Sequence, residues 1–241
     1  MIKTNSGGGI VDSVINQWNN AAESYSEFEA TSMYSRFCRE LISNRFNYVR
    51  GLKILDAGCG HGIFTHILSQ NGGDVTGCDG SDEMLKIARS SYPQYRFDEV
   101  DLKFGLPYED AQFDCVLCSL VLMDIDPIDS IITEFHRVLE PNGTLFFSIV
   151  HPAFYPGVWE KNENGVAVSK KVSRYINHFS LSQNTWGETM HYHRPISYYY
   201  NMMSTAGFRL TEMLEPNVYE GAKIPDIPLY LFSEFKKTDC M

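Results

Sequence analysis

The sequence predicts an α/β protein built around a mostly parallel β-sheet. From residue 52 onward, apolar runs of strand length alternate with amphipathic stretches of helix length, and Gly or Pro stands at many of the breaks. Before residue 52, apolar residues recur at helical spacing. A chain of 241 residues, 44% of them hydrophobic, can bury one large core. We therefore expect residues 1–241 to form a single domain.

The first part of the chain, residues 10–50, is expected to form a cap of two or three helices. Its apolar and aromatic positions follow one helical face and then a second: Val14, Trp18, Ala22 and Tyr25, followed by Tyr34, Phe37, Leu41 and Ile42.

Residues 52–151 are expected to form the core of the sheet. Strands are predicted at KILDA, DVTGCD, RFDEVD, FDCVLCSL and GTLFFSIV, with helices at FTHILSQN, SDEMLKIARSSY and DPIDSIITEFHRVLEP. Ser81, followed by Asp82 and Glu83, is typical of a helix start. Pro141-Asn142-Gly143 predicts a stop after RVLE.

Beyond residue 151 the pattern is less regular. Residues 152–195 lack a clear period and are rich in aromatic and polar side chains, which is typical of a lid or binding segment. ISYYYNMMSTAGF predicts a helix that ends at Gly207, so residues 152–200 are interpreted as a substrate lid and helix. FRLTEMLEP and PLYLFSEFKK predict a closing strand pair within residues 201–241.

Composition argues against several classes of partner. The formal net charge is −10 and no run of Lys or Arg occurs, which disfavours a nucleic-acid partner. The longest apolar runs are strand-sized, so no membrane span is expected. No segment has the basic start and apolar centre of a signal peptide, and the six cysteines are scattered, so we expect reduced thiols and a cytoplasmic location. Cys115 and Cys118 form a C-x-x-C pair, but on a strand they face opposite ways and are expected to be core residues.

The turn in KILDAGCGHG raises the question of its ligand. Strand, glycine turn and helix together let backbone N–H groups approach a nucleotide or an anion. A dinucleotide-binding G-x-G-x-x-G pattern would place a glycine at position 63, which is isoleucine. The glycines are instead Gly58, Gly60 and Gly62, preceded by Asp56. This spacing departs from pyrophosphate binding, although a nicotinamide-dependent dehydrogenase remains an alternative.

Polar residues close the next strands at the same edge of the sheet. Asp79 ends the second predicted strand, where a carboxylate can accept both hydroxyls of a ribose. Asp101 ends the third, where it can accept from an adenine amino group, and Ser119 and Leu120 end the fourth. These strand ends suit one adenosine-sized ligand.

Four segments, ILDAGCGHG, GCDGSDEML, VDLKFGLPYEDAQFDCVLCS and VLEPNGTLFFSIVHP, resemble in order the motifs of class I S-adenosylmethionine-dependent methyltransferases. The resemblance implies a Rossmann-like, seven-stranded sheet whose last strand is antiparallel, with helices on both faces. It further implies that S-adenosylmethionine binds here and leaves as S-adenosylhomocysteine. The implied cofactor-binding residues are Asp56, Gly58, Cys59, Gly60 and Gly62 for the methionine portion, Asp79 and Gly80 for the ribose, Met84, Asp101 and Leu102 for the adenine, Ser119 and Leu120 at the fourth strand, and Tyr25 from the segment WNNAAESY.

The implied activity is an in-line displacement that moves a methyl group to an oxygen or nitrogen atom of a small molecule. His151 follows the fifth core strand and is a candidate general base, the alternative being a histidine that orders its loop. His191 and His193 would share one face of an extended segment and are weaker candidates, and Arg194 beside them could bind an anion. Asp124 and Asp126 invite comparison with magnesium-dependent enzymes, but such acids are more typical of caps, and no metal is expected.

Two other functions stay open on the sequence alone. Related domains methylate tRNA bases, and a third possibility is a regulatory module that binds the cofactor without turnover. The C-terminal third resembles small-molecule methyltransferases, which favours a small-molecule acceptor. The oligomeric state, monomer or homodimer, does not follow from the sequence.

Overall fold

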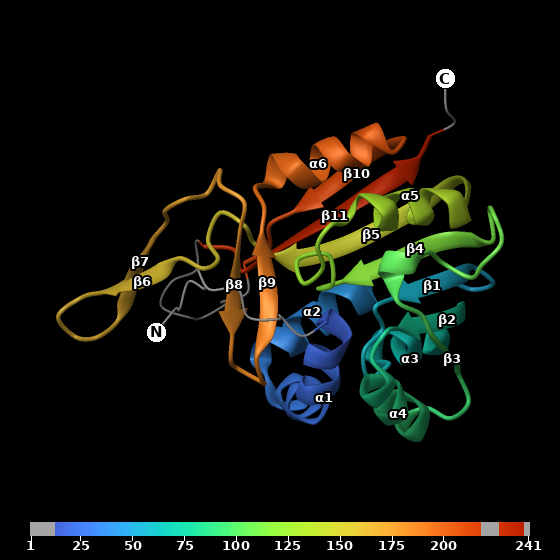
Figure 1. The fold of residues 1–241 in the computed structure, drawn as a ribbon, viewed down its shortest axis with the longest axis horizontal. Coiled ribbons are helices and arrows are strands. Elements are labelled where there is room, and N and C mark those ends of the chain that lie inside the picture. The colour runs from blue at the N-terminus through green and yellow to red at the C-terminus, as the bar shows by residue number, and fades with distance from the viewer. Residues whose placement is uncertain (1–12, 218–226, 239–241) are drawn as a thin grey trace.

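The computed structural model describes residues 13–217 and 227–238, so residues 10–12 of the expected helical cap and Cys240 lie outside the described residues. Its centre is a seven-stranded sheet with the order β10-β11-β5-β4-β1-β2-β3 (Figure 1). The strands are β1 Lys53–Ala57, β2 Asp74–Asp79, β3 Arg96–Glu99, β4 Phe113–Ser119, β5 Leu139–Val150, β10 Phe208–Leu214 and β11 Tyr230–Lys237.

Strand directions in this sheet match the predicted fold class. β1 is parallel to β2 and β4, β2 to β3, and β4 to β5. β11, the last strand in the chain, runs antiparallel to both of its neighbours, β5 and β10. The Rossmann-like arrangement with an antiparallel last strand is therefore confirmed.

Helices cover both faces of the sheet. On one face, α5 and α6 pack over alternate residues of β4 and β5, such as Val116 and Phe147. On the other, α2 and α3 pack over the intervening residues, such as Leu117 and Phe146. Cys115 and Cys118 fall on opposite faces, as the strand period requires, and both are buried. The helices are α1 Val14–Thr31, α2 Met33–Arg45, α3 Ile63–Gln70, α4 Asp82–Ser91, α5 Asp129–Val138 and α6 Ile196–Thr205, with a short 3₁₀ helix, η1, at Leu102–Phe104.

The N-terminal cap consists of α1 and α2, in agreement with the predicted helices. A single serine separates them: the Ser32 N–H donates to Phe28 O at 2.8 Å, and its side chain accepts from the N–H groups of Tyr34 and Ser35. Ser32 therefore ends one helix and caps the next, which fixes the turn between them.

The segment predicted to lack clear elements contains two hairpins. One pairs β6 (Val158–Lys161) with β7 (Ala167–Lys171), and the other pairs β8 (Phe179–Gln183) with β9 (Thr189–His193). The first projects away from the main sheet, and the second lies beside α1 (Figure 1). Their strands are only four or five residues long, which is too short for a convincing alternating pattern.

One helix boundary also differs from the prediction. α5 ends at Val138, two residues before the end of RVLE, because β5 already starts at Leu139. Pro141, Asn142 and Gly143 lie inside β5, where Asn142 has a left-handed φ of 62°. The pairing of β4 with β5 shifts register here, so the Pro-Asn-Gly sequence marks an irregularity in the strand.

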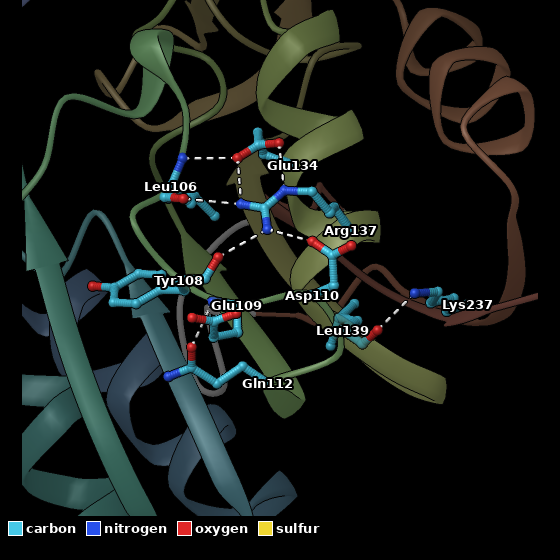
Figure 2. Close-up of polar contacts among 9 residues, drawn as sticks. All are labelled: Leu106, Tyr108, Glu109, Asp110, Gln112, Glu134, Arg137, Leu139 and Lys237. Atoms are coloured by element: carbon cyan, nitrogen blue, oxygen red, sulfur yellow. Dashed lines mark hydrogen bonds and ion pairs between the residues drawn. The ribbon is translucent and has the colours of Figure 1, made fainter.

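Arg137 of α5 fixes the loop between η1 and β4. Its guanidinium donates to the carbonyl oxygens of Leu106 and Tyr108, at 2.9 and 2.8 Å, and to the carboxylates of Glu134 and Asp110 (Figure 2). Glu134 also accepts from the Leu106 N–H at 2.8 Å. This network holds the loop that leaves Asp101 and η1 and so helps to set the third strand end.

Within residues 13–217 and 227–238, no helix is long and apolar enough to cross a membrane.

Candidate functional site

A cavity that is partly open to solvent lies at the C-terminal ends of β1, β2 and β4. Open α/β sheets bind ligands at this edge. Its lining residues come from α1 (Val14, Ile15, Trp18, Tyr25, Glu29), the glycine turn and α3 (Gly58, Cys59, Gly60, His61, Ile63, Phe64), the end of β2 and α4 (Asp79, Gly80, Ser81, Met84), the end of β3 (Asp101, Leu102) and the end of β4 (Ser119, Leu120, Val121, Asp124, Ile125).

Most of the predicted cofactor-binding residues meet in this cavity. Tyr25, Gly58, Cys59, Gly60, Asp79, Gly80, Met84, Asp101, Leu102, Ser119 and Leu120 all line it. Asp56 and Gly62 do not line it, and neither do the candidate catalytic residues His151, His191 and His193.

The glycine turn presents its backbone to the cavity. The N–H groups of Gly58 and Cys59 both donate to Cys78 O, which fixes the turn against the end of β2. Gly60 has a φ of 52°, and a Cβ added there would meet only the Met84 sulfur, at 3.9 Å. A Cβ on Gly62, with a φ of 86°, would instead meet Phe97 Cζ at 2.8 Å and Ala88 Cβ at 3.0 Å. Gly60 therefore keeps cavity space clear, whereas Gly62 lets α3 pack closely.

Asp56 lies behind the turn and is buried, with 1% of its surface exposed. Its carboxylate accepts a hydrogen bond from Thr65 Oγ1 at 2.7 Å. Burial raises the pKa of Asp56 to about 7, although the Thr65 hydrogen bonds lower it. In this structure Asp56 braces the turn against α3.

Asp79 ends β2 with its carboxylate facing the turn. One oxygen accepts from the Gly60 N–H at 2.9 Å and the other from the Ser81 N–H at 2.8 Å. Each oxygen keeps a second lone pair, which can accept a hydroxyl of a ligand. Burial raises the pKa of Asp79 in spite of these hydrogen bonds. The arrangement suits a vicinal diol that supplies two donors.

The next strand end supplies a polar edge and an apolar wall. Asp101 caps η1 by accepting from the Lys103 N–H at 3.0 Å, which sets the direction of Leu102. On the other side, Ser81 caps α4 by accepting from the Met84 N–H at 3.2 Å, as the sequence predicts. Met84 and Leu102 both line the cavity and are buried.

Helix α1 covers the cavity and is fixed at three places. Asn19 Oδ1 accepts from Ser81 Oγ at 2.7 Å, and Gln17 Oε1 accepts from the Met190 N–H of β9 at 3.0 Å. Glu29 contacts His61 of the glycine turn, with 3.2 Å between Oε2 and Nε2. Burial raises the pKa of Glu29, but the His61 hydrogen bond and the nearby Arg39 more than offset this and leave it lowered.

An aromatic cluster, Trp18, Tyr25, Phe28 and Trp186, joins α1 to the loop between β8 and β9. The ring of Trp186 stacks on Trp18 at 6.3 Å and meets Tyr25 edge-on at 5.1 Å. Trp186 therefore packs the β8–β9 loop onto α1, with its Nε1 buried and without a hydrogen-bond partner among the described residues. The three tyrosines of α6 also pack: Tyr198 lies edge-on to Tyr199, Tyr199 is buried near Phe147, and Tyr200 contacts Phe235.

Asp124 lies in the loop after β4 and faces the same cavity. It is 9% exposed, and burial raises its pKa well above the ordinary value, although the charge of Arg194 lowers it. Asp126, which the sequence groups with Asp124, is directed elsewhere and accepts from Arg194 Nη2 at 2.6 Å. Arg194 also donates to Leu122 O and Ile125 O, so its guanidinium holds this loop in place and is not available as an anion site.

The candidate catalytic histidines have other partners. His151 Nδ1 accepts from the Ala153 N–H at 3.2 Å and its Nε2 lies 2.6 Å from Glu215 Oε1, so His151 orders the loop after β5. His191 and His193 share a buried face of β9, as expected for alternate residues. His193 Nε2 donates to Tyr175 O at 2.9 Å. Burial lowers the pKa of His191 to about 3, so His191 is neutral.

Several cavity residues lie outside the predicted set. Trp18 and Glu29 lie two turns before and one turn after Tyr25 on the same face of α1, so helical spacing could have identified them. His61 stands inside the predicted turn. The sequence draws attention to Asp124 only as a possible metal ligand or cap, because whether it faces the cavity depends on how the loop after β4 folds.

Comparisons with known proteins concern the family and the fold of this chain. Residues 55–147 match the model of the methyltransferase domain family. A malonyl-[acyl-carrier protein] O-methyltransferase from Erwinia billingiae is 32% identical over 131 residues, which cover 54% of this chain and 51% of that protein. A ubiquinone biosynthesis O-methyltransferase from Pasteurella multocida is 32% identical over 123 residues, covering 46% and 51%. The chain thus spans about half the length of these curated relatives.

Among solved structures, a candidate S-adenosylmethionine-dependent methyltransferase from Listeria monocytogenes is similar over 79% of this chain and 91% of its own. The TM-score is 0.68 and the sequence identity is 25%. The similarity thus extends well beyond residues 55–147.

Proposed function

The chain belongs to the class I S-adenosylmethionine-dependent methyltransferases, and on this basis we propose that its cavity binds S-adenosylmethionine and that the enzyme methylates an oxygen or nitrogen atom of a small molecule. The charge of the cavity carries this proposal. Glu29, Asp79, Asp101 and Asp124 line it, and no described lining residue is Lys or Arg. Such a lining suits a sulfonium ion and an ammonium group and opposes the pyrophosphate of a dinucleotide.

Each part of the cofactor has a matching part of the cavity. We propose that Asp79 accepts the ribose hydroxyls and that Asp101 accepts from the adenine amino group, with Met84 and Leu102 on the faces of the ring. The backbone from Gly58 to Gly60 then lies beside the methionine portion. Tyr25 from α1 completes the enclosure next to Ser119 and Leu120.

The protein's contribution to the reaction is to orient the reactants and exclude water. Bound S-adenosylmethionine supplies an electrophilic methyl group. α1 covers the cavity and the β8–β9 hairpin packs against α1, which helps to orient an acceptor inside and to limit its exposure to solvent.

A small molecule fits this chain better than a tRNA base. The net charge of −10 opposes the approach of a polyanion. Both curated relatives are named as O-methyltransferases, which favours an oxygen acceptor. The described cysteines are all free and buried, in keeping with a cytoplasmic location. A monomer or a homodimer remains the predicted oligomeric state.

Calorimetry with S-adenosylhomocysteine and NAD tests the cofactor assignment. We expect S-adenosylhomocysteine to bind and NAD not to bind. Asp79→Ala should weaken binding about 100-fold or more, because two hydrogen bonds to a charged group are lost at roughly 1.5–3 kcal/mol each. Asp79→Asn, which keeps one acceptor oxygen, should have a smaller effect.

Asp82→Ala is the matched control, since Asp82 is a partly exposed acid at the start of α4 that pairs with Lys86 and does not line the cavity. Its affinity for S-adenosylhomocysteine should equal that of the parent. Equal affinity in Asp79→Ala and the parent would exclude the proposed ribose site, and binding of NAD alone would exclude the cofactor.

A further inference from the structure

Asp124 is a buried carboxylate that faces the cavity without a partner for its charge. It is 9% exposed, and no hydrogen bond reaches its carboxylate from residues 13–217 or 227–238. A buried carboxyl group without a hydrogen-bond partner is costly, and burial already raises the pKa of Asp124 well above its ordinary value. Its presence in a cavity wall therefore indicates a ligand that supplies the missing donor and favours the ionised form.

The groups around Asp124 do not supply that donor. His191 of β9 has its Nδ1 3.9 Å from Asp124 Oδ1, which is too far for a hydrogen bond, and burial keeps His191 neutral. Arg194 is the nearby cation, but its guanidinium is bonded to the loop carbonyls and to Asp126. Tyr155 packs edge-on against His191 at 4.7 Å between ring centroids. Among the described residues, none of these three side chains therefore donates a hydrogen bond to the Asp124 carboxylate.

Asp124 also lies on the acceptor side of the proposed cofactor site. The proposed partners of the ribose and adenine, Asp79, Asp101 and Met84, lie near the ends of β2 and β3. Asp124 instead follows β4, and His191 of the β8–β9 hairpin lies over it. Tyr25 of α1 lines the same cavity as Asp79 and Asp124. Burial raises the pKa of its phenol, and the charges of Glu29, Asp124 and Asp79 raise it further.

Building on the proposed function, we propose that Asp124 binds the methyl acceptor next to the reactive methyl group, and that the acceptor is an alcohol, a phenol or an amine. Its hydroxyl or amino group donates a hydrogen bond to the Asp124 carboxylate. Once that hydrogen bond keeps Asp124 ionised, an acceptor whose reacting group is itself a carboxylate or phosphate is disfavoured, because no Lys or Arg stands among the described lining residues to offset the repulsion.

Sinefungin tests this without knowledge of the acceptor. In this analogue of S-adenosylmethionine an amine-bearing carbon replaces the methylated sulfur, so its ammonium group occupies the place of the reactive methyl. S-adenosylhomocysteine lacks any group there. We expect calorimetry to show that Asp124→Asn weakens sinefungin binding about 10-fold or more and changes S-adenosylhomocysteine binding less than about 3-fold.

Asp129→Asn is the control, an equal change of charge at an exposed residue in the first turn of α5. Asp129→Asn should leave the affinities for sinefungin and for S-adenosylhomocysteine unchanged. If the parent binds both ligands and Asp124→Asn weakens them equally or not at all, the proposal for Asp124 is overturned while the cofactor site stands. If the parent binds neither ligand, the proposed function fails, and the proposal for Asp124 fails with it.

Release of S-adenosylhomocysteine from a panel of acceptors tests the substrate class separately. Turnover should occur only with acceptors that react at a hydroxyl or amino group. Preferential methylation of a carboxylate, such as that of a malonate monoester, would overturn the proposed class of methyl acceptor.

Discussion

Gly60 and Gly62 stand two residues apart in the same turn, yet alanine at each should have a different effect. Both have left-handed φ values, 52° and 86°, so alanine costs about 1–2 kcal/mol of backbone strain at either position. At Gly60 the new methyl group meets only the Met84 sulfur, at an ordinary contact distance of 3.9 Å. At Gly62 it overlaps Phe97 and Ala88, which adds about 1–3 kcal/mol.

Alanine at Gly62 should therefore mainly reduce stability, whereas alanine at Gly60 should mainly reduce cofactor binding. Gly62→Ala should lower the free energy of unfolding by about 2–5 kcal/mol and leave the cavity unchanged. Gly60→Ala should lower it by only about 1–2 kcal/mol. Because its methyl group enters the space assigned to the cofactor, it should also weaken S-adenosylhomocysteine binding roughly 10- to 100-fold.

Denaturant unfolding and calorimetry on both variants measure the two effects separately. The reasoning is refuted if Gly60→Ala binds S-adenosylhomocysteine as tightly as the parent. It is equally refuted if Gly62→Ala keeps the parent's stability, since the contacts with Phe97 and Ala88 would then not limit the turn.

Two further predictions concern stability alone. Arg137→Lys should cost about 2–4 kcal/mol of unfolding free energy in denaturant titration, because it leaves the Leu106 and Tyr108 carbonyls without their donor. The control Arg36→Lys, at an exposed pair with Glu40, should cost less than about 0.5 kcal/mol, and equal losses would contradict the argument. Asp56 has a pKa raised by burial to about 7, so its protonated form favours the folded state. Its contribution is complete below the unfolded pKa, near 4, and is lost as pH rises through about 7. Asp56→Asn should therefore flatten the fall in stability between about pH 4 and 7, and parallel curves for variant and parent would refute this.

The sequence was sufficient for the features that depend on local order along the chain. The alternation of apolar runs predicts the five parallel strands, and Ser81 correctly predicts the start of α4. Strand ends in a parallel sheet meet at one edge, so Asp79 and Asp101 could be brought together without coordinates.

Features that depend on packing between distant segments did not follow from the sequence. His151 stands at the correct sheet edge, but Glu215, 64 residues further along, binds its ring. The sequence predicts that Arg194 can bind an anion, but in the structure its guanidinium binds the Leu122 and Ile125 carbonyls and the Asp126 carboxylate. These three partners lie about 70 residues earlier, so the local sequence does not reveal them. Asp124 faces the cavity only because these bonds shape its loop.

The strand order also has a consequence for how the chain folds as it is synthesised. β10 lies at the edge of the main sheet and is joined to it only through β11, which comes later in the chain and fits between β5 and β10. Until residues 230–237 have emerged from the ribosome, β5 has an open edge and β10 has no partner in the sheet. Such an edge can pair with other chains. Loss of β11 would therefore also separate β10 from the sheet. We expect β10 to join the sheet only after β11 has been synthesised.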